Sequence, residues 1–360
     1  MNKSDQIKAL FNSLSPQEKG RLLKELQAAY TTGPQSNNRS QPTTCPHCQS
    51  AYIIKYGHWK QTQRYQCNTC QKTFNGATGS SRYHLKKPRQ FAAYKRLMTA
   101  QYSPLHEIAP KVGVSMQTAF DWRHKILSGL KKTDTTFRGI TEVDDLWFVY
   151  SQKGRKGLQY SRKRGGTSRP GDNNFQTKLL VTADRKSPLD MSVVRIGRLK
   201  KADLDKSIGT KCSADCTLVS DKHRSMAAFA KAQALPHVTF QAREHSAGGS
   251  YHTQQVNNVA SRFKALINHR LRGVSTKYLQ SYANWFAFQE RYKTRENLSH
   301  ILEKELQAVP HEHWHIFTSI EQIYKHFIQN HSVRTYRCPP KRAWKTSQMK
   351  PEFLNGMAYI

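Results

Sequence analysis

Apolar positions at helical spacing mark residues 1–30 as an N-terminal helical segment. The letters SPQE at residues 15–18 place a capping hydroxyl three positions before a glutamate, with proline as the first helical residue. We therefore expect a helix from about Pro16 to Tyr30. The polar stretch 31–44, punctuated by glycine and proline, then predicts a linker.

The pattern of residues 88–132 predicts two or three short helices. Ser103 followed by proline starts one helix, Gly113 breaks the chain, and Ser115 caps the next helix. A helix, a glycine turn and then an exposed polar helix is the spacing of a helix-turn-helix. An αα-hairpin used only for packing is the alternative. The helix-turn-helix interpretation places three side chains on the DNA-reading helix: Gln117, Thr118 and Arg123.

The pattern changes to strands in residues 138–295. The stretches ITEVDDLWFVYS, FQTKLLVTAD and MSVVRIG predict three strands, and TLVSD and HVTF predict two shorter strands, each followed by a helical stretch. Three strands followed by alternating helices and strands is the order of a ribonuclease H-like fold, an α/β architecture. We expect residues 296–360 to form a C-terminal helical extension and tail, so that the chain is multi-domain α+β overall.

The charge of the chain indicates its partner. Lysine and arginine number 58 against 24 acidic residues, a net charge of +34. An excess of this size indicates a polyanion, and nucleic acid fits it best. An anionic membrane surface is the rival partner, but no apolar run approaches the ~20 residues that span a bilayer. The N-terminus also lacks the apolar core of a signal peptide, so we expect a cytoplasmic protein with no membrane partner.

Four of the seven cysteines form two close pairs within residues 45–80. Each CxxC pair can present two thiolates in a tight turn, and two such turns complete a tetrahedron around zinc. The intervening strands have too little apolar mass to fold alone, so bound Zn²⁺ would supply stability. A redox dithiol is the alternative for a single pair. The sequence predicts a zinc ribbon with a structural ion held by Cys45, Cys48, Cys67 and Cys70. We expect Cys212, Cys216 and Cys338 to be ordinary thiols.

Two aspartates in the strand-rich segment suggest a second metal site. Asp144 lies in the middle of a predicted strand, and Asp221 ends another. Buried strands rarely carry acids, and open α/β sheets place their sites at strand ends. Two neighbouring carboxylates can bridge a pair of Mg²⁺ ions for phosphoryl transfer. The alternative is structural: Asp144 pairs with an arginine, and Asp221 caps the following helix.

The third ligand of such a site is not an obvious carboxylate, because residues 245–289 contain no aspartate or glutamate. Asn257 lies on the first turns of the next predicted helix, and an amide oxygen can bind Mg²⁺. Lys264 follows two helical turns later on the same face, where it could hold a phosphate. The alternatives are that Asn257 is a helix N-cap and that Lys264 is a solvated cation.

These motifs together resemble a known family. The order CPHC…CNTC, a helix-turn-helix, EVDD with SQKGRKG, SD, and HTQQVNNVASRFK with GVSTKYLQSYANWF is similar to bacterial insertion-sequence transposases of the DDE superfamily, in the zinc-ribbon, ISXO-like group. The resemblance covers about residues 45–295. It implies that Asp144, Asp221 and Asn257 bind catalytic Mg²⁺ or Mn²⁺, since the third family residue varies between Glu and Asn. The helical spacing adds Lys264 to the expected catalytic residues.

The resemblance also implies partners. The chain would bind double-stranded DNA, both element ends and target, cleave the 3′ ends and join them to target, as a homodimer or higher oligomer on the bacterial nucleoid. The ribbon and the helix-turn-helix would read the ends, and a basic loop would hold backbone phosphates. The cations of this loop are Lys153, Arg155, Lys156, Arg162, Lys163 and Arg164.

Two other functions fit the same residues. A DNA-binding regulator derived from a transposase would have lost the chemistry, and a metal-dependent nuclease would cut without strand transfer. The residue after Asp144 is Asp145, where many relatives have glutamate. Strand alternation must therefore decide which of the two carboxylates faces the site.

Overall fold

The structure is a computed structural model of the chain. It describes residues 3–31, 41–60, 62–83, 85–130, 136–154, 173, 176–186, 189–241 and 248–309. Five of the residues predicted to contact phosphates lie outside these described residues: Arg155, Lys156, Arg162, Lys163 and Arg164. Cys338 and the rest of the tail, residues 310–360, also lie outside them.

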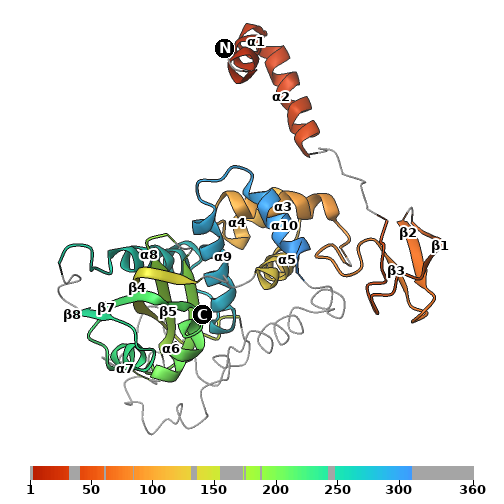
Figure 1. Ribbon diagram of the computed structural model, residues 1–360. Helices are drawn as coiled ribbons and strands as arrows, with labels where there is room; N and C mark the ends of the chain where they lie inside the picture. Colours follow the sequence, from red (N-terminus) through yellow and green to blue (C-terminus); the bar gives the residue numbers. More distant parts are fainter. Residues whose placement is uncertain are drawn as a thin grey trace, which may run out of the picture.

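Two helices, α1 (Lys3–Ser13) and α2 (Pro16–Thr31), form the N-terminal segment (Figure 1). The second helix begins at Pro16, as the capping pattern predicted. The Ser15 backbone N–H donates to Glu18 Oε2 at 2.9 Å, and the Glu18 N–H donates to Ser15 Oγ at 3.4 Å. These reciprocal bonds satisfy two backbone donors that the start of a helix otherwise leaves unpaired.

A small antiparallel sheet follows, made of β1 (Ile53–Trp59), β2 (Thr62–Cys67) and β3 (Thr73–Asn75). Its buried apolar cluster contains only four residues: Cys45, Tyr65, Cys67 and Phe74. So small a cluster cannot offset the conformational entropy of ordering the sheet. The ribbon therefore needs a cross-link other than apolar packing.

Three helices come next: α3 (Pro88–Ala100), α4 (Leu105–Val112) and α5 (Met116–Gly129). The predicted turn signals act where expected. Gly113 ends α4 with a φ of 68°, a left-handed conformation that glycine adopts without strain. Ser115 caps α5, because its Oγ accepts the Thr118 backbone N–H at 3.1 Å.

A five-stranded mixed sheet has the order β6-β5-β4-β7-β8. Strand β4 pairs antiparallel with β5 and parallel with β7, so it is the centre of the sheet. The order along the chain, three strands followed by alternating helices and strands, agrees with the prediction, and the structure adds that the first three strands pair antiparallel and the last two join in parallel. The strands are β4 (Phe137–Val149), β5 (Gln176–Asp184), β6 (Asp190–Ile196), β7 (Cys212–Asp221) and β8 (His237–Phe240).

Helices cover both faces of this sheet (Figure 1). Side chains of α6 and α7 pack with Val143, Leu180 and Leu218 on one face. On the other face, Phe263 of α8 meets Phe148 of β4 with ring centroids 5.6 Å apart. The helices are α6 (Lys201–Ile208), α7 (Arg224–Ala232), α8 (Gln254–Ala265), α9 (Leu279–Arg291) and α10 (Leu298–Gln307), with a π-helical turn at Leu266–Arg270 and a 3-10 turn at Thr276–Tyr278.

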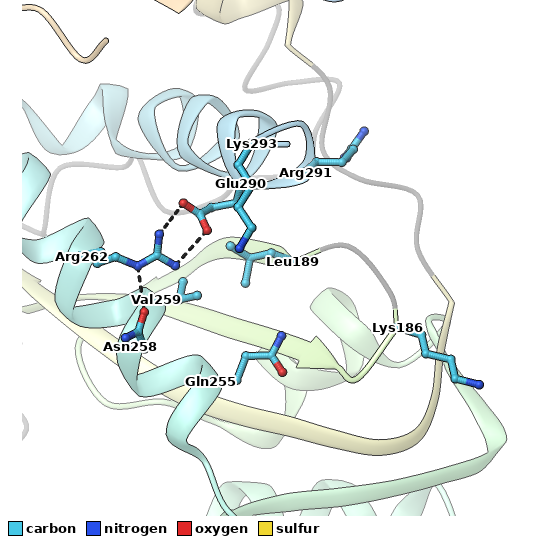
Figure 2. A pocket seen from close by; sticks show the side chains of 9 residues that line it. All are labelled: Lys186, Leu189, Gln255, Asn258, Val259, Arg262, Glu290, Arg291 and Lys293. Atoms are coloured by element: carbon cyan, nitrogen blue, oxygen red, sulfur yellow. Dashed lines mark hydrogen bonds and ion pairs between the residues drawn. The ribbon is translucent and has the colours of Figure 1, made fainter. Parts of the chain in front are cut away.

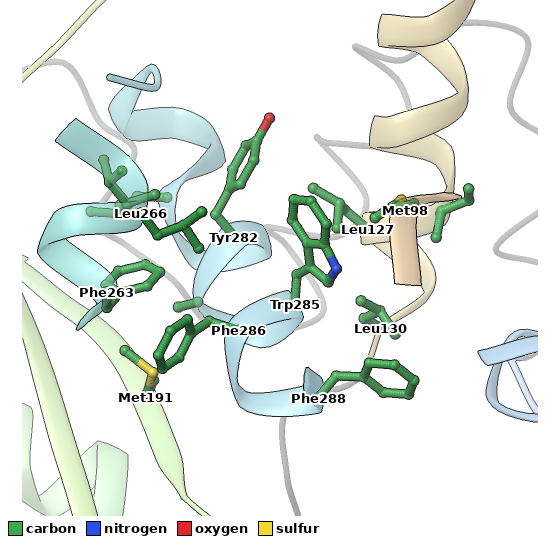
Figure 3. Packing of buried hydrophobic residues seen from close by; sticks show 14 of the residues in the cluster. Met98, Leu127, Leu130, Met191, Phe263, Leu266, Tyr282, Trp285, Phe286 and Phe288 are labelled. Carbon is green, nitrogen blue, oxygen red and sulfur yellow. The ribbon is translucent and has the colours of Figure 1, made fainter. Parts of the chain in front are cut away.

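The helices α3 to α5 share one hydrophobic core with this second face of the sheet. Trp285 of α9 lies at the junction, between Phe286 on the sheet side and Leu127 on α5 (Figure 3). Its ring lies 5.0 Å from that of Tyr102, and it is 1% exposed. The predicted division between residues 88–132 and 138–295 therefore does not coincide with a gap in the packing. In the described part of the chain, no helix is long and apolar enough to cross a membrane.

The expectation that Arg123 reads DNA is corrected by its position. Arg123 is 1% exposed and points into the shared core. Its Nε donates to Tyr94 Oη at 3.2 Å, its Nη2 donates to the Ser103 carbonyl at 2.5 Å, and its guanidinium lies over the Trp285 ring at 5.4 Å. The predicted helix is confirmed, but Arg123 lies on its buried face and not on its solvent-exposed face. The polar composition of the helix did not indicate that this arginine is buried.

We predict that Arg123→Ala lowers the free energy of unfolding by about 3 kcal/mol, because two buried acceptors lose a charged donor. Gln117→Ala is the control on the same helix: this side chain is exposed and should change stability by no more than about 0.5 kcal/mol. Chemical denaturation of both variants checks this. An Arg123→Ala variant of unchanged stability that has lost only DNA sequence preference would contradict it.

Candidate active site

Asp144 and Asp221 lie side by side where two parallel strands separate. The last paired residues of β4 and β7 are Glu142 and Val219, and each aspartate follows two positions later. Since side chains alternate along a strand, both aspartates are on the face that α8 covers. The strand order thus brings together two acids that are 77 positions apart in the sequence.

Asp145 is on the opposite face. Its Oδ2 lies 2.7 Å from Nζ of Lys178 on the neighbouring strand. Val143, two positions earlier, packs with α6 and α7 on that same face. The alternation that the sequence left open therefore assigns Asp144, and not Asp145, to the side of α8.

The structural alternatives for the two aspartates do not hold. Within the described residues, Asp144 forms no ion pair with an arginine; its Oδ1 accepts the backbone N–H of Asp145 at 2.8 Å. The N-cap of α7 is His223, whose Nδ1 accepts the Ser225 N–H at 3.3 Å, and not Asp221. Neither carboxylate is used up by a cap or an arginine.

The environment favours a cation at this place. Burial, together with the negative charges of Asp145 and Asp221, raises the pKa of Asp144 to about 7, although Lys264 acts in the opposite direction. Burial also raises the pKa of Asp221. Burial and mutual repulsion make it costly for both carboxylates to be ionised. A divalent cation between them would offset this cost, so the pair is suited to bind such an ion.

Asn257 is not a helix cap. It is the fourth residue of α8, and Thr253 occupies the N-cap position. The Asn257 Nδ2 donates to Thr253 Oγ1 at 3.1 Å, and the amide oxygen Oδ1 is the atom of this side chain that could bind a cation. Lys264 is on the same side of α8, with Nζ 5.6 Å from the Trp147 ring, and its charge acts on Asp144. One face of α8 thus carries both predicted residues toward the β4 edge.

Glu142 was missed by the sequence interpretation. It is fully buried on β4, two positions before Asp144, and contacts the first turn of α8. The available signal was a third acid in the EVDD strand at the same alternation as Asp144. We interpreted only the two aspartates because metal chemistry was the criterion.

The four ribbon cysteines converge as predicted. Their sulfur atoms all lie within 4.8 Å of one another. Cys45 Sγ lies 3.6 Å from Cys70 Sγ, and Cys48 Sγ lies 3.5 Å from Cys67 Sγ. Tetrahedral zinc with Zn–S bonds of about 2.3 Å requires sulfur separations of about 3.8 Å. Backbone N–H groups of Cys70 and Thr69 help to lower the pKa of Cys67 to about 6, which favours the thiolate that binds metal.

Comparison with known proteins places the central part of the chain. Residues 136–291, which contain both aspartates and α8, match the family model of the ISXO2-like transposase domain. The match covers less than half of the chain. The resemblance to insertion-sequence transposases that the motifs indicated is therefore confirmed for this domain.

A protein of Halobacterium salinarum, described as an uncharacterized protein in the transposable element ISH50, is 31% identical over 148 residues. That match covers 39% of this chain and about half (49%) of the relative. Crystal structures of the Mos1 pre-cleavage transpososome and of the Mos1 strand transfer complex overlap 69% of this chain, and 80% and 79% of those chains. Their identities are 11% and 13% and their TM-scores 0.22 and 0.23, values too low to support any inference.

A cavity beside α8 lies away from the aspartates, since neither Asp144 nor Asp221 lines it. It has a volume of about 430 Å³ and lies between α8 and the end of α9 (Figure 2). Gln255, Asn258 and Arg262 line this cavity. Their spacing of three and four positions places them on one face of α8, and Asn257 and Lys264 lie on another. We therefore assign the site by its donor atoms and not by the size of the cavity.

The three remaining residues predicted to contact DNA, Lys153, Gln117 and Thr118, differ in their exposure and in their contacts within the protein. Lys153 Nζ donates to the carbonyls of Leu271, Arg272 and Gly273 at 3.4, 3.0 and 2.7 Å, so it ties the loop to the turn after α8. Gln117 is exposed on the first turn of α5 and donates to Asp121 at 2.7 Å. Thr118 is half-buried in the cap of that helix.

We predict one zinc ion per chain by elemental analysis, lost in Cys67→Ser. Because the metal supplies local folding energy, the ribbon should unfold while the thermal transition of the transposase domain stays within a few degrees. Cys212→Ser, outside the ribbon, is the control and should keep its zinc. Absence of zinc from the native chain, or a disulfide among the four cysteines, would disprove this.

We predict that Mg²⁺ affinity at the aspartates rises with pH and levels off near 7. Asp144 holds its proton below about pH 7 in the metal-free fold, so the metal must displace it, which costs about tenfold in affinity per pH unit. The effect on folding has the opposite sign: a carboxyl with a raised pKa favours the folded state at low pH, and this stability is lost as pH rises from about 4 to 7. Calorimetric Mg²⁺ titrations from pH 5.5 to 8 check this, with Asp145→Asn as a comparison; an affinity independent of pH would contradict it.

Proposed function

We propose that the chain is a DNA transposase of the DDE superfamily, in the variant with asparagine as the third residue. The observation that carries this proposal is the pairing of Asp144 and Asp221 at the separating ends of β4 and β7, under a helix that carries Asn257, inside an ISXO2-like transposase domain. The mixed sheet with its three antiparallel and two parallel strands would be a ribonuclease H-like core.

The residues divide the chemistry as follows. Asp144, Asp221 and Asn257 Oδ1 would hold two Mg²⁺ or Mn²⁺ ions, which supply activation of the attacking oxygen and stabilise the leaving oxygen. Lys264 is exposed beside Asp144, so its ammonium can hold a phosphate next to the carboxylates. The chain would cleave 3′ ends with water and then join each 3′-OH to target DNA.

Charge supports double-stranded DNA as the partner. No aspartate or glutamate occurs between Glu25 and Glu107, a stretch that includes the ribbon and α3. The ribbon also exposes aromatic side chains on or next to β1: Tyr52 is 75% and Trp59 is 66% exposed. Arg64 lies 5.5 Å from the Tyr56 ring centroid. We propose that this ribbon face and the first turn of α5, with Gln117, contact the element ends. Joining two ends would require a homodimer or higher oligomer.

The test is strand transfer on labelled ends. Asn257→Ala should abolish cleavage and joining and leave DNA affinity unchanged, because a metal donor is lost and no charge is added. Asn258→Ala is the matched control: the adjacent side chain bonds Arg262 at 2.8 Å on another face and should keep activity. Asn257→Glu should keep partial activity with a changed preference between Mg²⁺ and Mn²⁺. Lys264→Ala should slow the reaction without weakening metal binding.

The outcomes separate the rival functions. Full activity in Asn257→Ala removes this residue from the site. Cleavage without any joined product indicates a nuclease. A native chain that binds DNA but never cuts it with either metal is a regulator, and the proposed function fails.

A further inference from the structure

We propose that Glu142 is the positioning residue of the carboxylate site, because it fixes the start of α8 on β4 and so sets where Asn257 stands relative to Asp144 and Asp221. This inference rests on the proposed function. It concerns a residue that touches neither DNA nor metal and acts through the helix that it holds.

One carboxylate oxygen of Glu142 caps α8. Oε2 accepts the backbone N–H of Gln255 at 2.9 Å and that of Val256 at 3.1 Å. These are the second and third residues of the helix, whose N–H groups have no partner within the helix. A negative charge at this end also interacts favourably with the helix dipole.

The local cap is missing from α8 itself. Thr253 occupies the N-cap position, yet its side chain makes no capping bond; its Oγ1 instead accepts the amide of Asn257. The cap therefore comes from a residue more than a hundred positions earlier in the chain. A local cap stabilises a helix wherever the helix lies, whereas a cap on another element also fixes the place of the helix.

The other oxygen of Glu142 holds the segments around the site. Oε1 lies 2.6 Å from Arg185 Nη1 and 3.3 Å from His252 Nδ1. Arg185 Nη2 also donates to the Ser250 carbonyl at 2.8 Å. The end of β5, the loop before α8 and the centre of β4 thus meet at one carboxylate that is 0% exposed.

These contacts would therefore fix the distance between Asp144 on β4 and Asn257 on α8. Asp144 is two residues from Glu142 on a central strand, and Asn257 is one residue beyond Val256 on α8. A shift of the α8 start would move the amide away from the carboxylates by the same amount. Burial of a charge so close to a site is costly, and it is offset here by four polar contacts of the carboxylate, two of them with backbone N–H groups at the start of α8.

The experiment compares Glu142→Ala and Glu142→Gln with the native chain in three measurements. These are hydrogen exchange of the α8 amides without metal, Mn²⁺ affinity by calorimetry, and DNA affinity. We expect faster exchange at Gln255 and Val256 and Mn²⁺ affinity about tenfold weaker in Glu142→Ala, the scale of lost indirect support of a metal ligand. The near-isosteric Glu142→Gln keeps an acceptor oxygen and should lie between the two; DNA affinity should not change.

Glu290→Ala is the matched control. Glu290 also binds α8, through Arg262 at 2.5 and 2.8 Å, but on the cavity side and away from the helix start. It should leave Mn²⁺ affinity unchanged. Native Mn²⁺ affinity in folded Glu142→Ala, or in Glu142→Gln if the alanine variant does not fold, overturns the proposal, as does an equal loss in Glu290→Ala. Failure of the proposed function is seen separately, as native Mn²⁺ affinity in Asp144→Ala.

Discussion

Three acids on the central strand β4 have to be compensated, and the way each is compensated organises the site. Glu142 is satisfied by the start of α8 and by Arg185, and Asp145 by Lys178 on the opposite face. Asp144 has no ion pair within the described residues and lies next to Asp221, so its proton is retained to about pH 7. Cationic side chains of the protein thus compensate two of the acids, and our proposal assigns the third to a metal ion.

The same sheet face connects this site to the helices α3 to α5. Trp285 packs against Tyr102, and the guanidinium of Arg123 lies over its ring, so α5 and α9 pack against each other. The salt bridge of Arg270 with Glu107 at 2.7 Å connects α4 to the turn after α8. These contacts connect the exposed first turn of α5, where we propose that DNA binds, to the helices that cover Asp144.

Local signals in the sequence predicted most of the elements. The capping interactions of SPQE, Gly113 and Ser115 involve residues at most four positions apart, so they can be predicted without knowledge of the fold. The spacing of the two CxxC pairs likewise predicted that the four sulfur atoms converge. The motif order also indicated insertion-sequence transposases, and residues 136–291 match the family model of the ISXO2-like transposase domain. What local patterns could not give was which side a residue faces. The side chain of Arg123 is buried by a core that includes Trp285 of α9. The role of Glu142 depends on contacts with a helix residue 113 positions further along the chain.

The central claim is that Asp144, Asp221 and Asn257 form one metal site. Anomalous diffraction from crystals of the chain soaked in Mn²⁺ tests it most directly, since the signal locates each ion without reference to activity. We expect a peak between the two carboxylates, with Asn257 Oδ1 at a bonding distance of about 2.1–2.3 Å. Strong Mn²⁺ peaks elsewhere, with none between Asp144 and Asp221, would contradict the account.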